Sequence, residues 1–338
     1  MNNKLKTILT TNEMIVIYII AGLSILIGSV NSAFFGVPTL ISLSRSMLVT
    51  LIFAVAEMIV IVSGGIDVSF PAVACISLYA TVKMMLAMNI DNPLFAYLMA
   101  ALIGTAFGLI NAILIAKIKI LPLIATLGVS SAVSGWTLAF LGTKEISNIP
   151  EGVDKLSQLF LFTYTSANGI KYSLTILAII PFVICIGAHI ILKHTMLGRG
   201  IYAIGGDSNA ARIAGFNVTR IQFITYMTSG CLAGIGGITY MILMRQASPQ
   251  VLMGSEMMVI AAVVIGGTRI TGGHGSVFGH GSVFGTFLGV CLISLVQNNL
   301  IMLGIPTHYQ TFVVGLIIVI GTAITSIRAK RIANSTKI

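Results

Sequence analysis

The stretch MLVTLIFAVAEMIVIVSGGIDVS (Met47–Ser69) decides the class of fold to which the chain belongs. Most of it lies in an apolar run over 40–63, in which Arg45 and Glu57 are the charged residues. Paired glycines and Asp67 follow the run. A helix that crosses a bilayer needs about 20 predominantly apolar residues. The stretch therefore predicts a transmembrane helix that ends near its paired glycines.

The composition of the whole chain extends this prediction. Of the 338 residues, 57% are apolar and 8% are charged, whereas about a quarter of the residues of a soluble domain are charged. A single soluble fold could not bury so much apolar surface, so we expect an all-α polytopic membrane protein. The four cysteines lie far apart in apolar runs without metal-binding spacing, and we interpret them as small buried apolar residues.

Ten stretches are apolar enough to be interpreted as transmembrane helices. They are 14–33, 40–63, 70–88, 94–116, 122–141, 172–192, 221–244, 256–268, 277–303 and 309–327. The eighth is short for a full span and the ninth is long. We therefore treat the regions near 122–141 and 256–285 as candidates for broken or re-entrant segments, whose irregular backbone must be covered by protein or line a cavity.

The basic residues predict the orientation, because Lys and Arg are enriched in cytoplasmic loops. They gather in the 193–220 loop, in the C-terminal tail and at Lys117 and Lys119, which ten spans place on one side together with the N-terminal lysines. In the 143–171 loop, on the other side, acidic and basic residues balance. We expect cytoplasmic termini and one transmembrane domain over 1–338. The net charge of +10 fits this orientation and does not indicate a nucleic-acid partner.

The 193–220 loop carries its own helix signals. Asp207 can accept a hydrogen bond from a free N–H at a helix start, and the residues after it favour a helix. Gly215 lies where a left-handed residue would end that helix. A helix of about two turns is marginal alone in water, so it must be held by something it packs against. An ordinary capped loop helix and a docking helix for a cytoplasmic partner both remain open from these signals.

Several motifs of the chain, in the same order, resemble permease subunits of bacterial ABC importers of the ribose and simple-sugar family, whose members carry ribose, xylose, arabinose, galactose or autoinducer-2. The loop pattern T-x-x-G-R-x-x-x-A-I-G-G followed by A-A-R-x-x-G-x-x-V is similar to the loop of that family that couples to the ATPase. Four further segments are similar, namely SGGIDVS (63–69), LPLIATLG (121–128), the run over 256–273 and GIPTHYQTFVVGLIIVI (304–320). Together they cover most of the chain from 40 to 327.

The resemblance implies a multi-pass subunit of the bacterial cytoplasmic (inner) membrane that moves a sugar or sugar-like solute inward. Its implied partners are two ATPase subunits or a fused double ATPase, a second permease copy or homologue, and a periplasmic sugar-binding protein. ATP and Mg would be bound by the ATPase. No cofactor, metal or catalytic residue is expected on this chain, which lacks the G-x-x-x-x-G-K-[ST] phosphate loop. The residues assigned to coupling by the resemblance are Gly198, Arg199, Gly205, Gly206, Asp207, Ala210, Ala211, Arg212 and Gly215.

Two departures from the family pattern stand out. The family usually has an acidic residue where this chain has Asn209, which alters the charge of the expected docking surface. It also usually has small residues after the SGGIDVS segment, where this chain has Phe70 and Pro71. A bulky residue and a fixed φ could change the start of the third span.

Polar residues inside the spans are candidates for the translocation path, because ionisable groups at membrane depth are expensive and often functional. The candidates are Glu57, Gly64, Gly65, Asp67 and Asn298. For each there is also a structural interpretation: Asp67 could cap the next helix, and Glu57 and Asn298 could bond neighbouring helices. Glu57 or Asp67 would be the ion site if the protein were instead an ion-coupled secondary transporter.

Two repeats complete the pattern. IVSGGID (61–67) and VVIGGTR (263–269) each end an apolar run with paired glycines and a charge, a weak indication of duplicated halves. In GGHGSVFGHGSVFGTFLG (272–289) the hexapeptide HGSVFG occurs twice. The two histidines have no third ligand nearby, so we interpret the repeat as a duplication within a glycine packing motif. One copy is expected to loop out before the ninth span.

Overall fold

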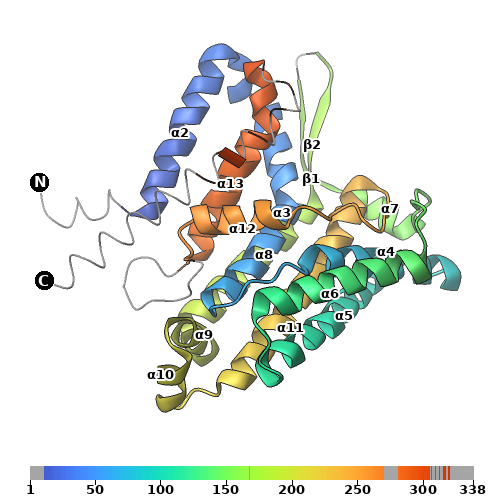
Figure 1. The fold of residues 1–338 in the computed structure, drawn as a ribbon. Helices are drawn as coiled ribbons and strands as arrows, with labels where there is room; N and C mark the ends of the chain where they lie inside the picture. The colour runs from blue at the N-terminus through green and yellow to red at the C-terminus, as the bar shows by residue number, and fades with distance from the viewer. Residues whose placement is uncertain are drawn as a thin grey trace, which may run out of the picture.

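The structure is a computed structural model that describes residues 11–166, 168–269 and 281–304, together with positions 306, 309, 312, 315, 316 and 319. Within these residues the protein is mainly helical, and eight helices are long and apolar enough to cross a membrane (Figure 1). They are α2 Asn12–Val30, α3 Val37–Val62, α4 Phe70–Met88, α5 Pro93–Ala112 with the π turn η2 Ile113–Lys117, α6 Pro122–Trp136 with the π turn η3 Thr137–Leu141, α8 Ile179–His194 preceded by the 3₁₀ turn η4 Ile176–Ala178, α11 Val218–Met244, and α13 Val283–Asn299 with the 3₁₀ turn η5 Leu300–Leu303. The prediction of an all-α polytopic fold is confirmed, while most of the tenth predicted span, 309–327, lies outside the described residues.

The third span begins where the sequence predicted, in spite of its unusual first residues. α4 starts at Phe70, and Pro71 lies in its first turn. A proline is tolerated there because the N–H that it lacks would have no partner within the helix. The departure from the family pattern therefore leaves the start of the helix intact.

The broken segment predicted in the second half of the chain lies around α12 Glu256–Ile265. This helix has 10 residues and is about 15 Å long, half the thickness of the hydrocarbon core. The chain before it, 245–255, is not helical, yet Ala247 and Leu252 are buried. The N–H of Leu252 donates to Cys75 Sγ of α4 at 3.4 Å, and Ala247 pairs with Ile146 in an isolated β-bridge. This irregular backbone is thus covered by protein, as membrane depth requires. Near 122–141 the irregularity is confined to the π turn at the end of α6.

α5 and α11 form the most extensive helix pair among the described elements. Their backbones approach closely at glycines: a Cβ on Gly104 or Gly108 would overlap the backbone of α11, and one on Gly230 or Gly234 would overlap that of α5. Without a strong hydrophobic force between helices in lipid, such close packing is a main source of their association. The two helices can therefore be treated as one rigid unit.

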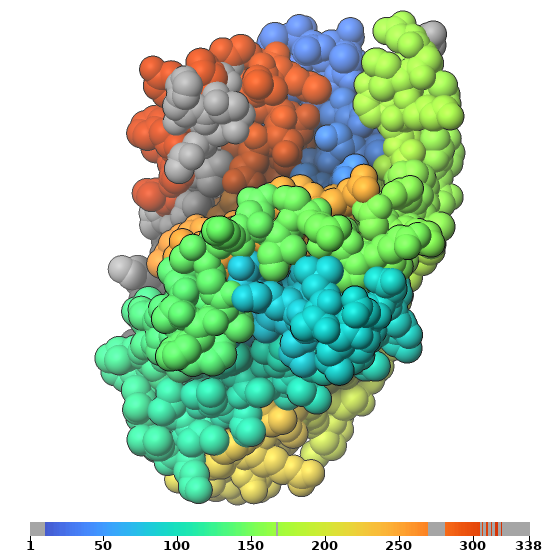
Figure 2. All heavy atoms as spheres, turned by 90° about the vertical axis from the view of Figure 1, so that its right-hand side faces the viewer, coloured from blue at the N-terminus to red at the C-terminus, as the bar shows by residue number. Residues whose placement is uncertain are grey.

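Between α6 and α8 the chain forms a short helix and a β-hairpin on the side opposite the 193–220 loop. The helix is α7 Glu151–Ser157, and the strands β1 Phe160–Thr165 and β2 Lys171–Thr175 pair antiparallel. The hairpin stands beside α3, and Figure 2 shows it as the yellow-green column at one edge of the molecule. It was not predicted, because the loop was interpreted only through its balanced charges.

The remaining helices, α9 Met196–Gly206 and α10 Ser208–Ile213, connect α8 to α11 at the other end of the molecule (Figure 1). α10 is the short helix that the sequence predicted. α9 was not predicted, because its sequence MLGRGIYAIGG is rich in glycine, which weakens helix propensity.

Candidate functional site

The 193–220 connection begins with a tight reversal between α8 and α9. Thr195 caps α9, and its Oγ1 accepts a hydrogen bond from the Gly198 N–H at 3.2 Å. A Cβ on Gly198 would overlap the carbonyl oxygens of Ile191 and Leu192 at the end of α8. The T-x-x-G pattern therefore has a structural cause: the threonine caps the helix, and the glycine lets the two helices meet.

α10 is a capped helix on the surface of this connection. Asp207 Oδ1 accepts hydrogen bonds from the N–H groups of Asn209 at 2.7 Å and Ala210 at 3.2 Å. Gly215 follows the helix with a φ of +88°, and the N–H of the next residue returns to Ala211 O at 3.0 Å. The predicted cap, helix and left-handed glycine are all confirmed. Asn209, where the family has an acid, donates its backbone N–H to the cap and does not replace it.

The side chains of α10 divide between the protein and the surroundings. Ala211 is buried, whereas Ala210 and Arg212 are exposed and Ile213 is 89% exposed. Arg199, on α9, is also exposed. Five of the nine residues predicted to couple to a partner are thus exposed, namely Arg199, Asp207, Ala210, Arg212 and Gly215.

The end of α9 meets the glycine turn that comes after α3. Gly64 has a φ of +87°, which favours glycine, and a Cβ built on it would lie 3.5 Å from Gly205 Cα. α9 also packs against α11. The predicted coupling loop and the predicted path residues at 64–67 therefore adjoin, although they are far apart in the sequence.

The turn over 63–69 is held by buried hydrogen bonds from several helices. Asp67 Oδ1 accepts from the Ser69 N–H at 2.9 Å and from Ser69 Oγ at 2.6 Å, and Oδ2 accepts from Ser229 Oγ of α11 at 2.9 Å. Asn111 Nδ2 of α5 donates to Ser69 Oγ at 2.7 Å. On the α6 side, the Val68 N–H donates to Oγ1 of the threonine at position 126 at 3.3 Å. The side chain of Asp67 bonds the residue before α4 and does not cap that helix itself.

Glu57 lies inside the same network. It is fully buried, and its Oε1 accepts from the Asp67 N–H at 3.2 Å, while Oε2 has no hydrogen-bond partner among the described residues. Asp67 is 2% exposed. The Tyr226 phenol packs against the turn, because a Cβ on Gly65 would overlap its oxygen. The structure thus brings four of the five candidate path residues together at this turn, where Glu57, Gly65 and Asp67 are buried and Gly64 is exposed.

Asn298, the fifth candidate, lies elsewhere. It is exposed on α13, and its Nδ2 donates to Ser46 Oγ of α3 at 3.0 Å and to Ser294 O at 2.7 Å. Ser46 is eleven residues before Glu57 on α3, or about 16 Å along the helix axis. Asn298 therefore bonds α13 to α3 well away from the buried turn. A role of any of the five in the path stays a prediction.

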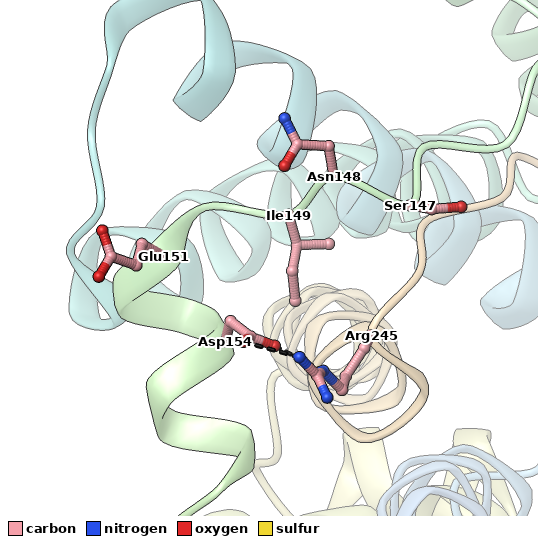
Figure 3. Close-up of a pocket in the computed structure, with 6 residues that line it drawn as sticks. All are labelled: Ser147, Asn148, Ile149, Glu151, Asp154 and Arg245. Carbon is pink, nitrogen blue, oxygen red and sulfur yellow. Dashed lines mark hydrogen bonds and ion pairs between the residues drawn. The ribbon is translucent and has the colours of Figure 1, made fainter.

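A polar pocket opens on the opposite side, where α7 meets the end of α11 (Figure 3). Arg245 donates through Nε and Nη2 to the Asp154 carboxylate at 2.5 and 2.8 Å. Glu151 forms an exposed ion pair with Lys155 at 2.7 Å, and the hydrogen bond and charge of Lys155 lower the pKa of Glu151. The cavity has a volume of about 300 Å³ and is lined by Ser147, Asn148, Ile149, Glu151, Asp154 and Arg245. The ion pair joins Asp154 on α7 to Arg245 at the end of α11, 91 residues later in the sequence, so no local pattern predicts it.

No group of three or more His, Cys, Asp or Glu side chains that could hold a metal occurs among the described residues. The duplicated hexapeptide lies largely outside them. Gly285, the last glycine of the repeat, packs against Gly266 O, and Gly289, which follows the repeat, lies one turn later against Ala262 O. These two contacts confirm the glycine packing of the described part of the motif, while the predicted looping out of one copy falls outside the described residues.

The long apolar helices are those of a multi-pass membrane protein. A family profile described as "Branched-chain amino acid transport system / permease component" matches residues 39–321. The chain belongs to this family.

Several relatives match nearly the full chain. It is 29% identical over 300 residues to the ribose import permease protein of Escherichia coli K12, covering 88% of this chain and 89% of the relative. It is 32% identical to the ribose import permease protein of Bacillus subtilis, covering 88% of each. It is 35% identical to the fructose import permease protein of Bifidobacterium longum, covering 80% of this chain and 77% of the relative. No solved structure matches the chain. Together with the apolar helices, these relatives indicate a multi-pass protein of the bacterial inner membrane.

Proposed function

We propose that the chain is the transmembrane permease subunit of an ATP-binding-cassette importer that moves a sugar or sugar-like solute into the cytoplasm. The observation that carries the proposal is the match to import permeases along 88% of the chain, joined to a loop helix that is capped and exposed as a docking element requires. The sugar class comes from the names of the relatives, which include ribose, fructose and D-allose import proteins.

In this proposal α10 is the coupling helix. A separate ATPase chain binds ATP and Mg and covers the exposed face of α10, where Arg212 and Ile213 lie. Closure of the ATPase pair on ATP displaces α10 and switches the translocation path between outward-facing and inward-facing states. The path requires a second permease copy or homologue, and a periplasmic binding protein delivers the solute to the outer face, near α7 and the hairpin.

One charged and one apolar side chain of α10 are available for docking. Arg212 offers a guanidinium that can bond a carboxylate or backbone carbonyls of the ATPase, and Ile213 offers an apolar side chain for a pocket. The short helix would be marginal alone, but Ala211 and the Asp207 cap fix it to the protein before docking. The partner therefore meets a preformed element.

The direct test is co-purification of this chain with its ATPase. Arg212→Glu is expected to reduce co-purification by at least about tenfold, because it places a like charge where a complementary one is required. The matched control is Lys171→Glu, the same charge reversal on the exposed hairpin of the opposite side. Size-exclusion profiles in detergent report whether each variant is folded. Normal co-purification of a folded Arg212→Glu variant would contradict the assignment of α10.

A further inference from the structure

The 63–69 turn occupies a mechanical position between the proposed coupling loop and the helix core. On one side, Gly64 of the turn lies close to Gly205 at the end of α9, since a Cβ built on Gly64 would lie 3.5 Å from Gly205 Cα. Only Gly206 separates that contact from Asp207, the cap of α10. A displacement of α10 can therefore reach this turn through the end of α9, in addition to the direct contacts of α9 and α10 with α11.

On its other side, the turn is bonded to the rigid α5–α11 pair. Asp67 Oδ2 accepts from Ser229 Oγ of α11 at 2.9 Å, and Asp67 Oδ1 is joined through Ser69 Oγ to Asn111 of α5. Ser229 directly precedes Gly230, one of the glycines at which α11 touches α5. The carboxylate of Asp67 thus ties the turn to both helices of the pair.

Bonds of this kind are strong and directional. The Asp67 carboxyl takes part in three hydrogen bonds of 2.6 to 2.9 Å. They lie in the interior, where Asp67 is 2% exposed, so water cannot replace them. A neutral amide at the same place would keep the shape but would lose part of the strength and would bring donors where the carboxylate accepts.

We propose that Asp67 is a positioning residue of the transport cycle, which fixes the 63–69 turn between α9 and the α5–α11 pair so that movement of α10 is transmitted to that pair. The inference rests on the proposed function and deepens it, since it assigns the route from the docking helix into the membrane domain. Asp67 does not contact the solute in this proposal. Its carboxylate acts through Ser229 and Ser69.

The first test measures coupling in the complete complex with its ATPase and binding protein in proteoliposomes. Asp67→Asn and Ser229→Ala are compared with Ser77→Ala, a matched control on α4 whose hydroxyl is buried but has no partner among the described residues. The readouts are ATP hydrolysis and uptake of radiolabelled D-ribose, D-fructose or D-allose, whichever the parent accumulates. Asp67→Asn is expected to hydrolyse ATP at a rate within about twofold of the parent, while uptake per ATP falls about tenfold. Ser229→Ala shows a smaller fall in the same direction, and Ser77→Ala shows none.

Several results would overturn the proposal. Unchanged uptake per ATP in Asp67→Asn and Ser229→Ala would do so, and so would a proportional fall of hydrolysis and uptake, which indicates a slower cycle with intact coupling. If Asp67→Asn does not assemble, Ser229→Ala decides alone. Uptake by the parent without any ATPase contradicts the proposed function itself, a result distinct from either.

The second test needs no solute. An environment-sensitive dye is attached to Leu98→Cys, near the outer end of α5, where Leu98 is 63% exposed. The four native cysteines, which are unpaired, are replaced by alanine. ATP is expected to change the dye signal in the parent complex and in Ser77→Ala, and to change it at least about threefold less in Asp67→Asn. An equal response in Asp67→Asn, or no response in the parent, would show that α10 does not drive α5 through this residue.

Discussion

The turn after α3 and the turn after α12 have the same backbone geometry but different polar contents. In the first, the N–H groups of Gly64 and Gly65 return to Ile61 O and Val60 O at 2.9 and 3.1 Å. In the second, those of Gly267 and Thr268 return to carbonyls of 264 and 263 at 2.9 and 3.2 Å. Gly64 has a φ of +87° and Gly267 a φ of +101°. The two turns therefore share a left-handed glycine geometry that is common at helix ends, and the duplication of halves stays a prediction.

The structural correspondence of the two turns, however, differs by one residue from the alignment of their sequences. The letters align Gly64 with Gly266, but the residue equivalent to Gly64 in conformation is Gly267. Gly266 has an ordinary φ, and its glycine is required for a different reason, because a Cβ there would overlap the backbone of Gly285 on α13. Gly266 and Gly267 therefore have separate roles, the first in helix packing and the second in the geometry of the turn.

The polar residues at the two turns differ most. Asp67 is buried and accepts three hydrogen bonds, whereas Thr268 is buried with a hydroxyl that has no partner among the described residues. Both turns share the glycine geometry, but among the described residues such a polar network is found only at the first turn. The glycine turn geometry and the buried hydrogen bonds of Asp67 can therefore be perturbed by separate substitutions.

The largest expected effect on stability comes from removing the carboxyl group that distinguishes the first turn from the second. Asp67→Ala removes the acceptor of three bonds and leaves the buried hydroxyl of Ser229 unpaired, so it should lower the free energy of unfolding by about 3 kcal/mol. Thr268→Val removes only an unpartnered hydroxyl and should change it by less than about 1 kcal/mol. Thermal midpoints in detergent, followed by a thiol-reactive dye, measure both. Equal losses would show that the network adds nothing to the first turn.

A smaller effect tests whether the two glycine turns are equivalent in geometry. Gly64→Ala and Gly267→Ala each place a Cβ on a left-handed residue, at a cost of about 1–2 kcal/mol. Because a methyl group on Gly64 would meet Gly205 Cα at an ordinary 3.5 Å, torsional strain accounts for its cost. The same dye assay should give similar shifts for the two variants, with that of Gly267 slightly larger because Asn12 lies 3.3 Å from the new Cβ. A neutral effect at either position would mean that the turns are not equivalent.

Local signals account for the features that the sequence predicted well. The limits of α4, 70–88, and of α10 derive from apolar length, the Asp207 cap and the left-handed Gly215, which all act within a few residues. The side of the membrane on which each loop lies was predicted from charge alone. α9 was missed because its glycines concealed a helix that needs the close reversal at Gly198 to form.

Long-range contacts account for the features that could not be predicted. Asp67 and Ser229 are 162 residues apart, and no local pattern announces that their side chains meet. The irregular segment over 245–255 is stable only because α4 covers it, and the hairpin depends on pairing across its own loop. Among the predicted path residues, the structure groups Glu57 with Asp67 but leaves Asn298 on another helix face, a distinction that depends on the packing of α3, α5, α11 and α13.

The claim that this chain is an importer subunit driven by a separate ATPase is tested most directly by uptake into proteoliposomes. Vesicles contain the permease with its binding protein, with or without the ATPase, and are given radiolabelled D-ribose, D-fructose or D-allose in the presence or absence of ATP. The account predicts accumulation only when the ATPase and ATP are both present. Accumulation in vesicles that lack the ATPase, driven by an ion gradient, would contradict it.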